Sequence, residues 1–245
     1  MKGIILAAGY ATRLYPLTRN FPKPLLKVRG KSILEYLLED LSKEAGIDRF
    51  ILVSNHRYAE HFSRFAEEKI YPLTILDDGT ETNETRLGAV RDLELAVREC
   101  ASGEDLLVAA GDNLLDFSLR RFLDYAKERG TSCIMRYYEP DEARLRHSGV
   151  VAVDDRGLAV AMEEKPEMPA SHWCVPPFYY LKAEDAALTG TALEDGCGSD
   201  SPGRFIAWLC AHRPVHAMVM PGKRYDIGDI RSYQAAELVY QGITV

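Results

Sequence analysis

The sequence has little of what disulfide-linked, metal-cluster or membrane proteins require. Its 245 residues include only five cysteines, and no two of them form a C-x-x-C pair. An odd number of cysteines in a chain large enough to bury a core favours free thiols over disulfides or a metal site. These cysteines are Cys100, Cys133, Cys174, Cys197 and Cys210.

Long apolar runs are also missing. No stretch of about 18 apolar residues occurs, so we expect no membrane-spanning helix. The first residues lack the apolar core and cleavage site of a secretory signal, and we expect a cytoplasmic protein.

Histidine and glycine do not form known binding patterns. His212 and His216 are four residues apart, but Pro214 breaks the helix that would place them on one face. The loop after the first apolar run has Gly9 alone, whereas a dinucleotide-binding fingerprint needs three glycines. A dinucleotide-dependent oxidoreductase is therefore disfavoured.

Acidic residues are absent from positions 1–34, which carry seven lysines and arginines, although the whole chain has a net charge of −7. Nucleic-acid binding would need basic surface spread over a whole face. A cationic start on an acidic body instead favours a small, highly charged anionic ligand.

Apolar runs alternate with segments of helical period, which is typical of an α/β protein with a mixed, mostly parallel, Rossmann-like sheet flanked by helices. Ser32 and Glu35 form a capping pair for a first helix. We predict strands at 2–7, 49–54, 74–76, 105–110, 132–138, 149–157, 158–166, 174–181 and 215–220, and helices at 33–41, 58–68, 87–97, 118–128, 203–211 and 229–241. The second half is expected to add an antiparallel or mixed layer.

The segment 6–32 follows the first predicted strand, at the sheet edge where open α/β folds bind ligands. Small residues there leave room for backbone N–H groups to approach phosphate oxygens. Arg13 can contact two oxygens at once, and flanking prolines fix Lys23 as a point charge. The small residues are Ala7, Ala8, Gly9 and Ala11. The alternative is a solvated basic loop after a buried strand.

Four motifs occur in order along the chain: LAAGYATRL with a following PKP, then Gly111-Asp112-Asn113, Glu164-Lys165-Pro166, and Arg224-Tyr225-Asp226-Ile227-Gly228-Asp229. They resemble the motifs of the nucleoside-triphosphate transferase family, which includes sugar-1-phosphate nucleotidyltransferases and phosphocholine cytidylyltransferases. The family usually has glycine or serine where Ala11 stands. The resemblance covers residues 1 to 241.

This resemblance implies a GT-A-like fold in a single domain, 1–245, with a nucleotide half at about 1–130 and an acceptor half at about 131–245. It implies that Gly9, Thr12 and Arg13, beside Ala7 and Ala8, hold a triphosphate and that Lys23 contacts the reacting phosphates. Arg13 and Lys23 would then be catalytic. It further implies magnesium on Asp112 and Asp226, and an acceptor held by Gly149, Glu164, Lys165 and Tyr179. Taken alone, Asp112 can be a turn residue and Asp226 part of a helix cap.

The segment 77–90 is expected to contact the nucleobase through Asn83 and Gly88, by analogy with related thymidylyltransferases. The alternative is an ordinary polar loop that caps a helix. An amide both donates and accepts hydrogen bonds, so Asn83 fits cytosine, uracil or thymine. The sequence therefore leaves the base open.

Family members that use a sugar phosphate often have a glycine before an aromatic residue in the strand after E-K-P, and the resemblance therefore implies that the bulkier Pro176 and Pro177 argue against a hexose pocket. Trp173, Phe178 or Tyr179 can form a cation-π wall for an ammonium group or belong to the core. We expect a magnesium-dependent cytidylyltransferase that acts on phosphocholine or aminoethylphosphonate. The alternatives are a sugar-1-phosphate uridylyl- or thymidylyltransferase and, more distantly, a non-catalytic nucleotide-binding protein. We expect no nucleic-acid or membrane partner and leave a homodimer open.

Overall fold

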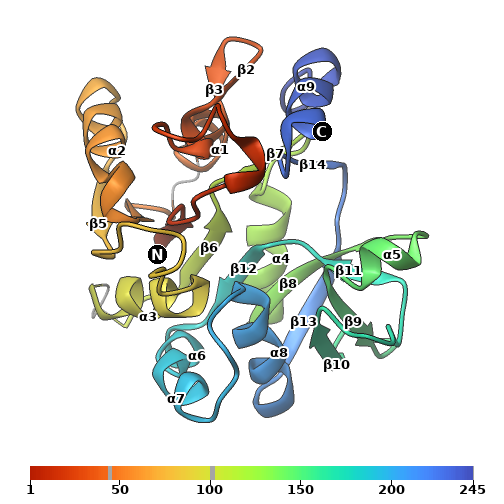
Figure 1. Cartoon of the computed structure of the whole chain (residues 1–245). Helices are drawn as coiled ribbons and strands as arrows, with labels where there is room; N and C mark the ends of the chain where they lie inside the picture. Colours follow the sequence, from red (N-terminus) through yellow and green to blue (C-terminus); the bar gives the residue numbers. More distant parts are fainter. Residues whose placement is uncertain (44–45, 100–102, 245) are drawn as a thin grey trace. The chain divides into compact units, whose positions relative to one another are not determined.

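The structure is a computed structural model that describes residues 1–43, 46–99 and 103–244 (Figure 1). Its chain forms two compact units. Unit 1 consists of residues 1–86, 110–120 and 221–245, and unit 2 consists of residues 87–109 and 121–220. Unit 1 is therefore assembled from three separate segments of the chain, including both of its ends.

Unit 1 contains three parallel strands in the order β1 (Lys2–Leu6), β4 (Arg49–Ser54) and β5 (Leu73–Asp77). The first two strands were predicted from their apolar runs, and their central residues are buried. Parallel strands end at the same sheet edge, so the loops after them lie together.

Side-chain caps start the two helices that follow these strands. Helix α1 (Ile33–Leu41) begins after Ser32, whose Oγ accepts the Glu35 amide at 3.2 Å, as the capping pair predicts. Helix α2 (His56–Glu68) begins two residues earlier than predicted, because Asn55 Oδ1 accepts the Tyr58 amide at 3.0 Å. An asparagine cap directly after a strand leaves no loop between the two elements.

Short elements complete unit 1: the 3-10 turns η1 (Thr12–Leu14) and η2 (Lys23–Leu25), the hairpin β2 (Lys27–Val28) and β3 (Lys31–Ser32), the strands β7 (Asn113–Leu115) and β14 (Arg224–Asp226), and helix α9 (Ile230–Val239). Strands β7 and β14 pair antiparallel, with Asn113 opposite Asp226. This pairing brings residues that are over a hundred positions apart in the sequence to neighbouring places.

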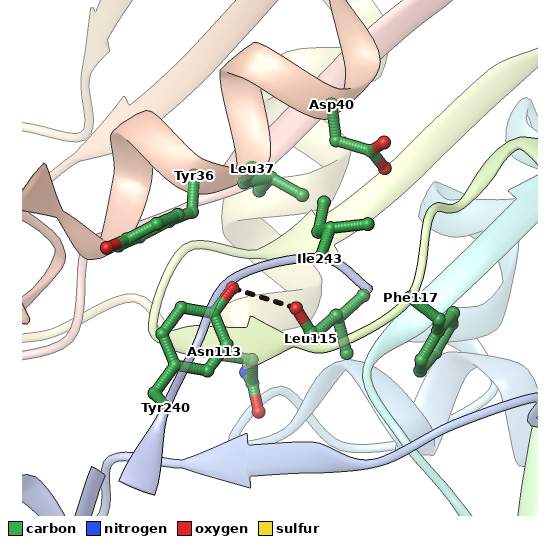
Figure 2. Close-up of a pocket in the computed structure, with 8 residues that line it drawn as sticks. All are labelled: Tyr36, Leu37, Asp40, Asn113, Leu115, Phe117, Tyr240 and Ile243. Atoms are coloured by element: carbon green, nitrogen blue, oxygen red, sulfur yellow. Dashed lines mark hydrogen bonds between the residues drawn. The ribbon is translucent and has the colours of Figure 1, made fainter. Parts of the chain in front are cut away.

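The C-terminal segment is fixed by the core of unit 1. Tyr240 is buried, and its hydroxyl donates to the Leu115 carbonyl at 2.8 Å (Figure 2). Its ring lies edge-on to Tyr36 of α1, with centroids 5.0 Å apart. The cavity next to this hydrogen bond holds only about 10 Å³, which is water-sized rather than ligand-sized.

Unit 2 contains a mixed sheet, as predicted for the second half. The strands run in the order β10 (Ala159–Glu164), β9 (Gly149–Val153), β11 (Trp173–Val175), β8 (Ser132–Tyr138), β12 (Phe178–Leu181) and β6 (Leu106–Ala110). These neighbours pair antiparallel, whereas β13 (Val215–Val219) pairs parallel with β8. Together with the parallel strands of unit 1, this gives the predicted α/β class.

The helices of unit 2 are α3 (Ala89–Glu99), α4 (Arg120–Arg129), α5 (Glu142–Leu145), α6 (Ala183–Ala186), α7 (Thr189–Glu194) and α8 (Pro202–His212). Helices α3, α7 and α8 pack together (Figure 1). Helix α8 also packs on β10, which carries Glu164 at its end.

The segment 174–181 was predicted as one extended piece, but it forms two strands, β11 and β12, separated by Pro176 and Pro177. Proline lacks the N–H that a central strand needs, so the ladder is interrupted there.

The described cysteines are free thiols, as the sequence predicts, and the described helices lack the features of a membrane span. Four cysteines are free thiols, Cys133, Cys174, Cys197 and Cys210, while Cys100 lies outside the described residues. Within residues 1–43, 46–99 and 103–244, every helix is too short or too polar to cross a membrane.

Candidate active site

An ion pair between a buried lysine and a partly exposed aspartate marks the centre of the candidate site in unit 1. Lys23, on η2, places its Nζ 2.7 Å from Asp112 Oδ2, and its side chain is only 9% exposed. Burial raises the pKa of the Asp112 carboxyl, but the charges of Lys23 and Arg224 outweigh it and hold that pKa below its ordinary value. Asp112 is therefore an anion at neutral pH, and Lys23 is the fixed charge that the flanking prolines predicted.

Asn113 and Arg224 connect the two predicted metal ligands. Asn113 Nδ2 donates to Asp112 Oδ1 at 2.6 Å, and Arg224 Nη1 donates to Asn113 Oδ1 at 2.8 Å. Arg224 Nη2 lies 3.7 Å from Asp226 Oδ2. The ladder of β7 and β14 thus carries a continuous chain of contacts from Lys23 to Asp226.

Arg13 belongs to the same neighbourhood. A Cβ placed on Gly228 would lie 3.9 Å from Arg13 Nη2, so the guanidinium reaches the loop that follows Asp226. Arg13 and Thr12 are exposed, and a Cβ added at Gly9 would meet no atom within 4 Å. The loop after β1 therefore presents open space with a cation beside it.

The small residues of this loop have different local roles. The Ala7 amide donates to the Val53 carbonyl at 2.9 Å, and the Ala8 carbonyl accepts from Asn55 Nδ2 at 2.9 Å. These two residues therefore extend the sheet contact, and the Ala7 N–H already has a partner. Ala11 adopts φ 47° and ψ 44°, the left-handed conformation. The predicted family's preference for glycine here has a direct conformational reason.

The donor set fits magnesium. Asp112 and Asp226 offer carboxylate oxygens from adjoining positions, and magnesium takes one or two carboxylates with substrate oxygens and water. The described part of the chain holds no group of three or more His, Cys, Asp and Glu side chains that suits a metal. An ion bound here would therefore rely on substrate for several ligands.

The predicted acceptor residues form a second cluster, within unit 2. Glu164 accepts a hydrogen bond from Ser201 Oγ at 2.7 Å. A Cβ would lie 2.8 Å from Glu164 Oε2 if built on Gly149, and 2.0 Å if built on Gly203. These glycines make space for the carboxylate, and burial raises its pKa above the ordinary value while Ser201 and Lys165 oppose the shift.

Lys165 is held beside this carboxylate by an acidic partner. Its backbone has φ 54°, and its Nζ lies 3.1 Å from Asp200 Oδ2. Asp200 also accepts from Arg204 Nε at 2.6 Å. The side chains are partly exposed, so an anion in solution can reach Lys165 and Arg204.

The aromatic residues near the acceptor motif do not form an open wall. Tyr179 and Phe178 are buried, at 2% and 0% exposure. The Arg136 guanidinium lies over one face of the partly buried Trp173 ring, 4.3 Å from its centroid. The structure therefore supports the core alternative for Phe178 and Tyr179 and gives Trp173 a cation from the protein itself.

The predicted base-contacting residues fall in different units. Asn83 belongs to unit 1, and its carbonyl accepts from Arg86 Nη1 at 2.6 Å. Gly88 belongs to unit 2, has φ 94°, and a Cβ there would come within 2.4 Å of the Ser199 carbonyl oxygen. Gly88 is thus required by its local packing, and its contact with a base stays a prediction.

Sequence reasoning missed the roles of Asn113, Arg224, Asp200, Ser201 and Arg204. Asn113 and Arg224 stand inside the quoted motifs, and their position beside the aspartates predicted to bind metal was the available signal. The other three lie more than thirty residues after Glu164, and only the packing of α8 on β10 brings them to it.

Comparison with known proteins identifies the class. The chain matches the model of the nucleotidyl transferase family over residues 2–241, and it belongs to this family. A structure of UDP-glucose pyrophosphorylase complexed with UDP-glucose has the same fold, with a TM-score of 0.79, 20% identity and 96% of each chain covered.

Two sequence relatives transfer a nucleotide to a sugar 1-phosphate according to their names. The chain is 28% identical to mannose-1-phosphate guanylyltransferase 1 of Arabidopsis thaliana, over 95% of this chain and 63% of that protein. It is 33% identical to glucose-1-phosphate thymidylyltransferase of Mycolicibacterium smegmatis, over 74% of this chain and 60% of that protein. The chain thus spans less than two thirds of the length of either relative.

Proposed function

We propose that the protein is a magnesium-dependent sugar-1-phosphate nucleotidyltransferase that transfers a nucleoside monophosphate from a triphosphate to a sugar 1-phosphate and releases pyrophosphate. The observation that carries this proposal is the Lys23–Asp112 ion pair, linked through Asn113 and Arg224 to Asp226. The guanylyltransferase and the thymidylyltransferase described above both carry a sugar 1-phosphate in their names, which supports this acceptor class.

In this mechanism the chain aligns and neutralises phosphates. Arg13 and Lys23 bind the triphosphate, and the acceptor phosphate attacks the α-phosphorus in line with the departing pyrophosphate. A phosphate monoester has a second pKa near 6, so the acceptor is a dianion at pH 7 and needs no general base. When bound to Asp112 and Asp226, magnesium supplies further positive charge to the phosphate oxygens.

The acceptor is assigned to the cluster in unit 2. Lys165 and Arg204 offer two cations for its phosphate, and Glu164 offers a carboxylate that accepts hydrogen bonds from sugar hydroxyls. Asp200 holds both cations in place before the acceptor arrives. This division gives each ionisable side chain of the E-K-P motif a substrate contact.

The sequence favoured cytidylyl transfer to phosphocholine, and the structure and the relatives now favour the sugar alternative. Phe178 and Tyr179 are buried, and the Arg136 guanidinium already lies over one face of Trp173, so these three residues do not form the aromatic wall that an ammonium group would need. The thymidylyltransferase relative is 33% identical over 74% of this chain and the guanylyltransferase relative is 28% identical over 95% of it, so the assay below compares their nucleotides with UTP and CTP.

A pyrophosphate-release assay tests the proposal. Each of CTP, UTP, dTTP and GTP is combined with glucose 1-phosphate, mannose 1-phosphate, choline phosphate or aminoethylphosphonate, with magnesium or with EDTA. We expect turnover with a hexose 1-phosphate and magnesium only, and its loss in Asp112→Asn but not in Glu60→Gln, an exposed carboxylate on α2. Turnover with choline phosphate as the sole acceptor would support the cytidylyltransferase hypothesis instead. Full activity of Asp112→Asn would contradict the metal-binding role proposed for Asp112.

A further inference from the structure

Basic residues of segment 1–34 lie at two different places in unit 1. Arg13 and Lys23 belong to that site, but Lys27 and Lys31 line a separate cavity of about 430 Å³ within unit 1. Arg64 and Lys69 add two more cations to the same lining. Neither Arg13, Lys23, Asp112 nor Asp226 is among the lining residues, so this cavity is distinct from the site.

The cavity combines an apolar surface with this charge. Phe21, Leu25 and Phe65 supply the apolar part, and the Phe21 ring lies edge-on to His61 at 5.3 Å between centroids. Phe21 is 37% exposed, although it is a large apolar side chain. A volume of this size is typical of small-molecule sites, and an exposed aromatic edge suits a flat ring.

The charges in the lining favour an anion. Four cations face two carboxylates, Glu35 and Glu68. Lys69 is paired with Glu35 at 2.7 Å, and the Lys27 ammonium has no side-chain partner among the described residues.

The two remaining cations have partners outside the cavity: Lys31 pairs with Glu39 and Arg64 with Glu60. Both pairs are partly or largely exposed, and exposed pairs are weak enough for a multiply charged ligand to compete.

We propose that this cavity binds a nucleotide, with its phosphate on Lys27, Lys31 and Arg64 and its base against Phe21 and Phe65. Leu25 forms part of the cavity, and Lys23 begins the same 3-10 turn, η2. A ligand that packs on Leu25 therefore acts on the element that positions Lys23. The effect on Lys23 rests on the proposed function, whereas nucleotide binding in the cavity does not.

Binding is measured by calorimetry without turnover. The full chain carrying Arg13→Ala and Asp112→Asn, which disables the candidate site, is titrated with CMP, UMP, TMP and GMP in EDTA, and with inorganic phosphate. We expect at least one nucleotide to bind this chain with one site, and phosphate to bind at least tenfold more weakly. Adding Lys27→Glu or Phe21→Ala is expected to weaken nucleotide binding at least tenfold and threefold, respectively.

A matched control is Lys127→Glu, an exposed lysine on α4 that is expected to leave binding unchanged. Thermal unfolding of each variant checks that the fold is kept. Three results would each overturn the proposal. They are nucleotide binding that is unchanged by both Lys27→Glu and Phe21→Ala, the absence of any nucleotide binding, and phosphate binding as tight as nucleotide binding. In the chain with both sites intact, the nucleotide should shift the KM for triphosphate at least twofold. If the nucleotide binds in the cavity but the KM does not shift, the proposed effect on Lys23 is overturned and the binding site is not.

Discussion

At the scale of single residues, Ala11 carries a conformational cost in the loop after β1. Its φ of 47° is left-handed, which costs an L-residue about 1–2 kcal/mol, whereas glycine adopts it freely. We expect Ala11→Gly to raise the free energy of unfolding by about 0.5 kcal/mol, measured by urea denaturation. The control is Ala8→Gly, at a buried position without positive φ, which should lower it; an equal effect of both changes would contradict the explanation.

Lys23 offers a second test at this scale, because it is the buried cation of the candidate site. Losing a pre-placed charge at reacting phosphates typically costs about 100-fold or more in rate. Lys23→Ala is therefore expected to lower kcat/KM for the triphosphate by about 100-fold, measured by pyrophosphate release. Arg19→Ala removes an exposed cation of the same basic segment and should change kcat/KM less than twofold.

At the scale of elements, Asp105 joins three pieces of unit 2. Its carboxylate accepts from Tyr180 Oη at 2.6 Å, Lys182 Nζ at 2.7 Å and the Ala183 amide at 3.0 Å, next to the start of α6. Burial raises the pKa of Asp105, but these hydrogen bonds outweigh it and the net pKa is lowered. The ionised form is therefore the one that stabilises the fold.

The pH dependence follows from this direction. A lowered folded pKa means that the stabilisation is complete above the ordinary value of 3.8 and is lost as the pH falls through the folded pKa. Asp105→Asn is expected to lower the free energy of unfolding by about 2 kcal/mol at pH 7 and by clearly less at pH 3. Urea denaturation at both pH values measures it, and a difference that does not shrink at pH 3 would contradict the role of the charge.

At the scale of the whole molecule, unit 1 depends on segments from both ends of the chain. The Tyr240 hydroxyl donates to the Leu115 carbonyl in the core, at the last residue of the strand β7 that begins at Asn113. Tyr240→Phe leaves this carbonyl unpaired and should lower the free energy of unfolding by about 1–2 kcal/mol. Tyr138→Phe, on an exposed ring, should change it by less than 0.5 kcal/mol; equal losses in thermal or urea unfolding would show that the core hydrogen bond is not the cause.

The sequence predicted the long elements well because their periodicity spans many residues. Strands 49–54 and 132–138 have the predicted bounds, and α8 (Pro202–His212) is one residue longer at each end than the predicted helix at 203–211. The three-residue strands β7 and β14 were not predicted, since three residues carry no detectable period. Yet these two strands bring Asp112 and Asp226 to neighbouring places, so the motifs predicted the two aspartates and could not predict the pairing that brings them together.

The residues predicted to hold the acceptor also depend on packing that the sequence does not reveal. Glu164 and Lys165 stand together in a motif, but Ser201, Asp200 and Arg204 reach them only because α8 packs on β10. Likewise, the sequence left open whether the aromatic residues after the motif form a wall or belong to the core, and the burial of Phe178 and Tyr179 depends on sheet pairing. Local patterns in a single sequence do not predict contacts between segments that are far apart along the chain.

The division into two units has a spectroscopic consequence. Both tryptophans of the chain, Trp173 and Trp208, belong to unit 2, and unit 1 contains none. Native tryptophan emission therefore reports on the unit that holds the E-K-P motif and is silent about the unit that holds Lys23 and Asp112. Emission and far-ultraviolet circular dichroism followed in the same denaturation will coincide only when the two units unfold together, so the unmodified chain already carries a probe of their cooperativity.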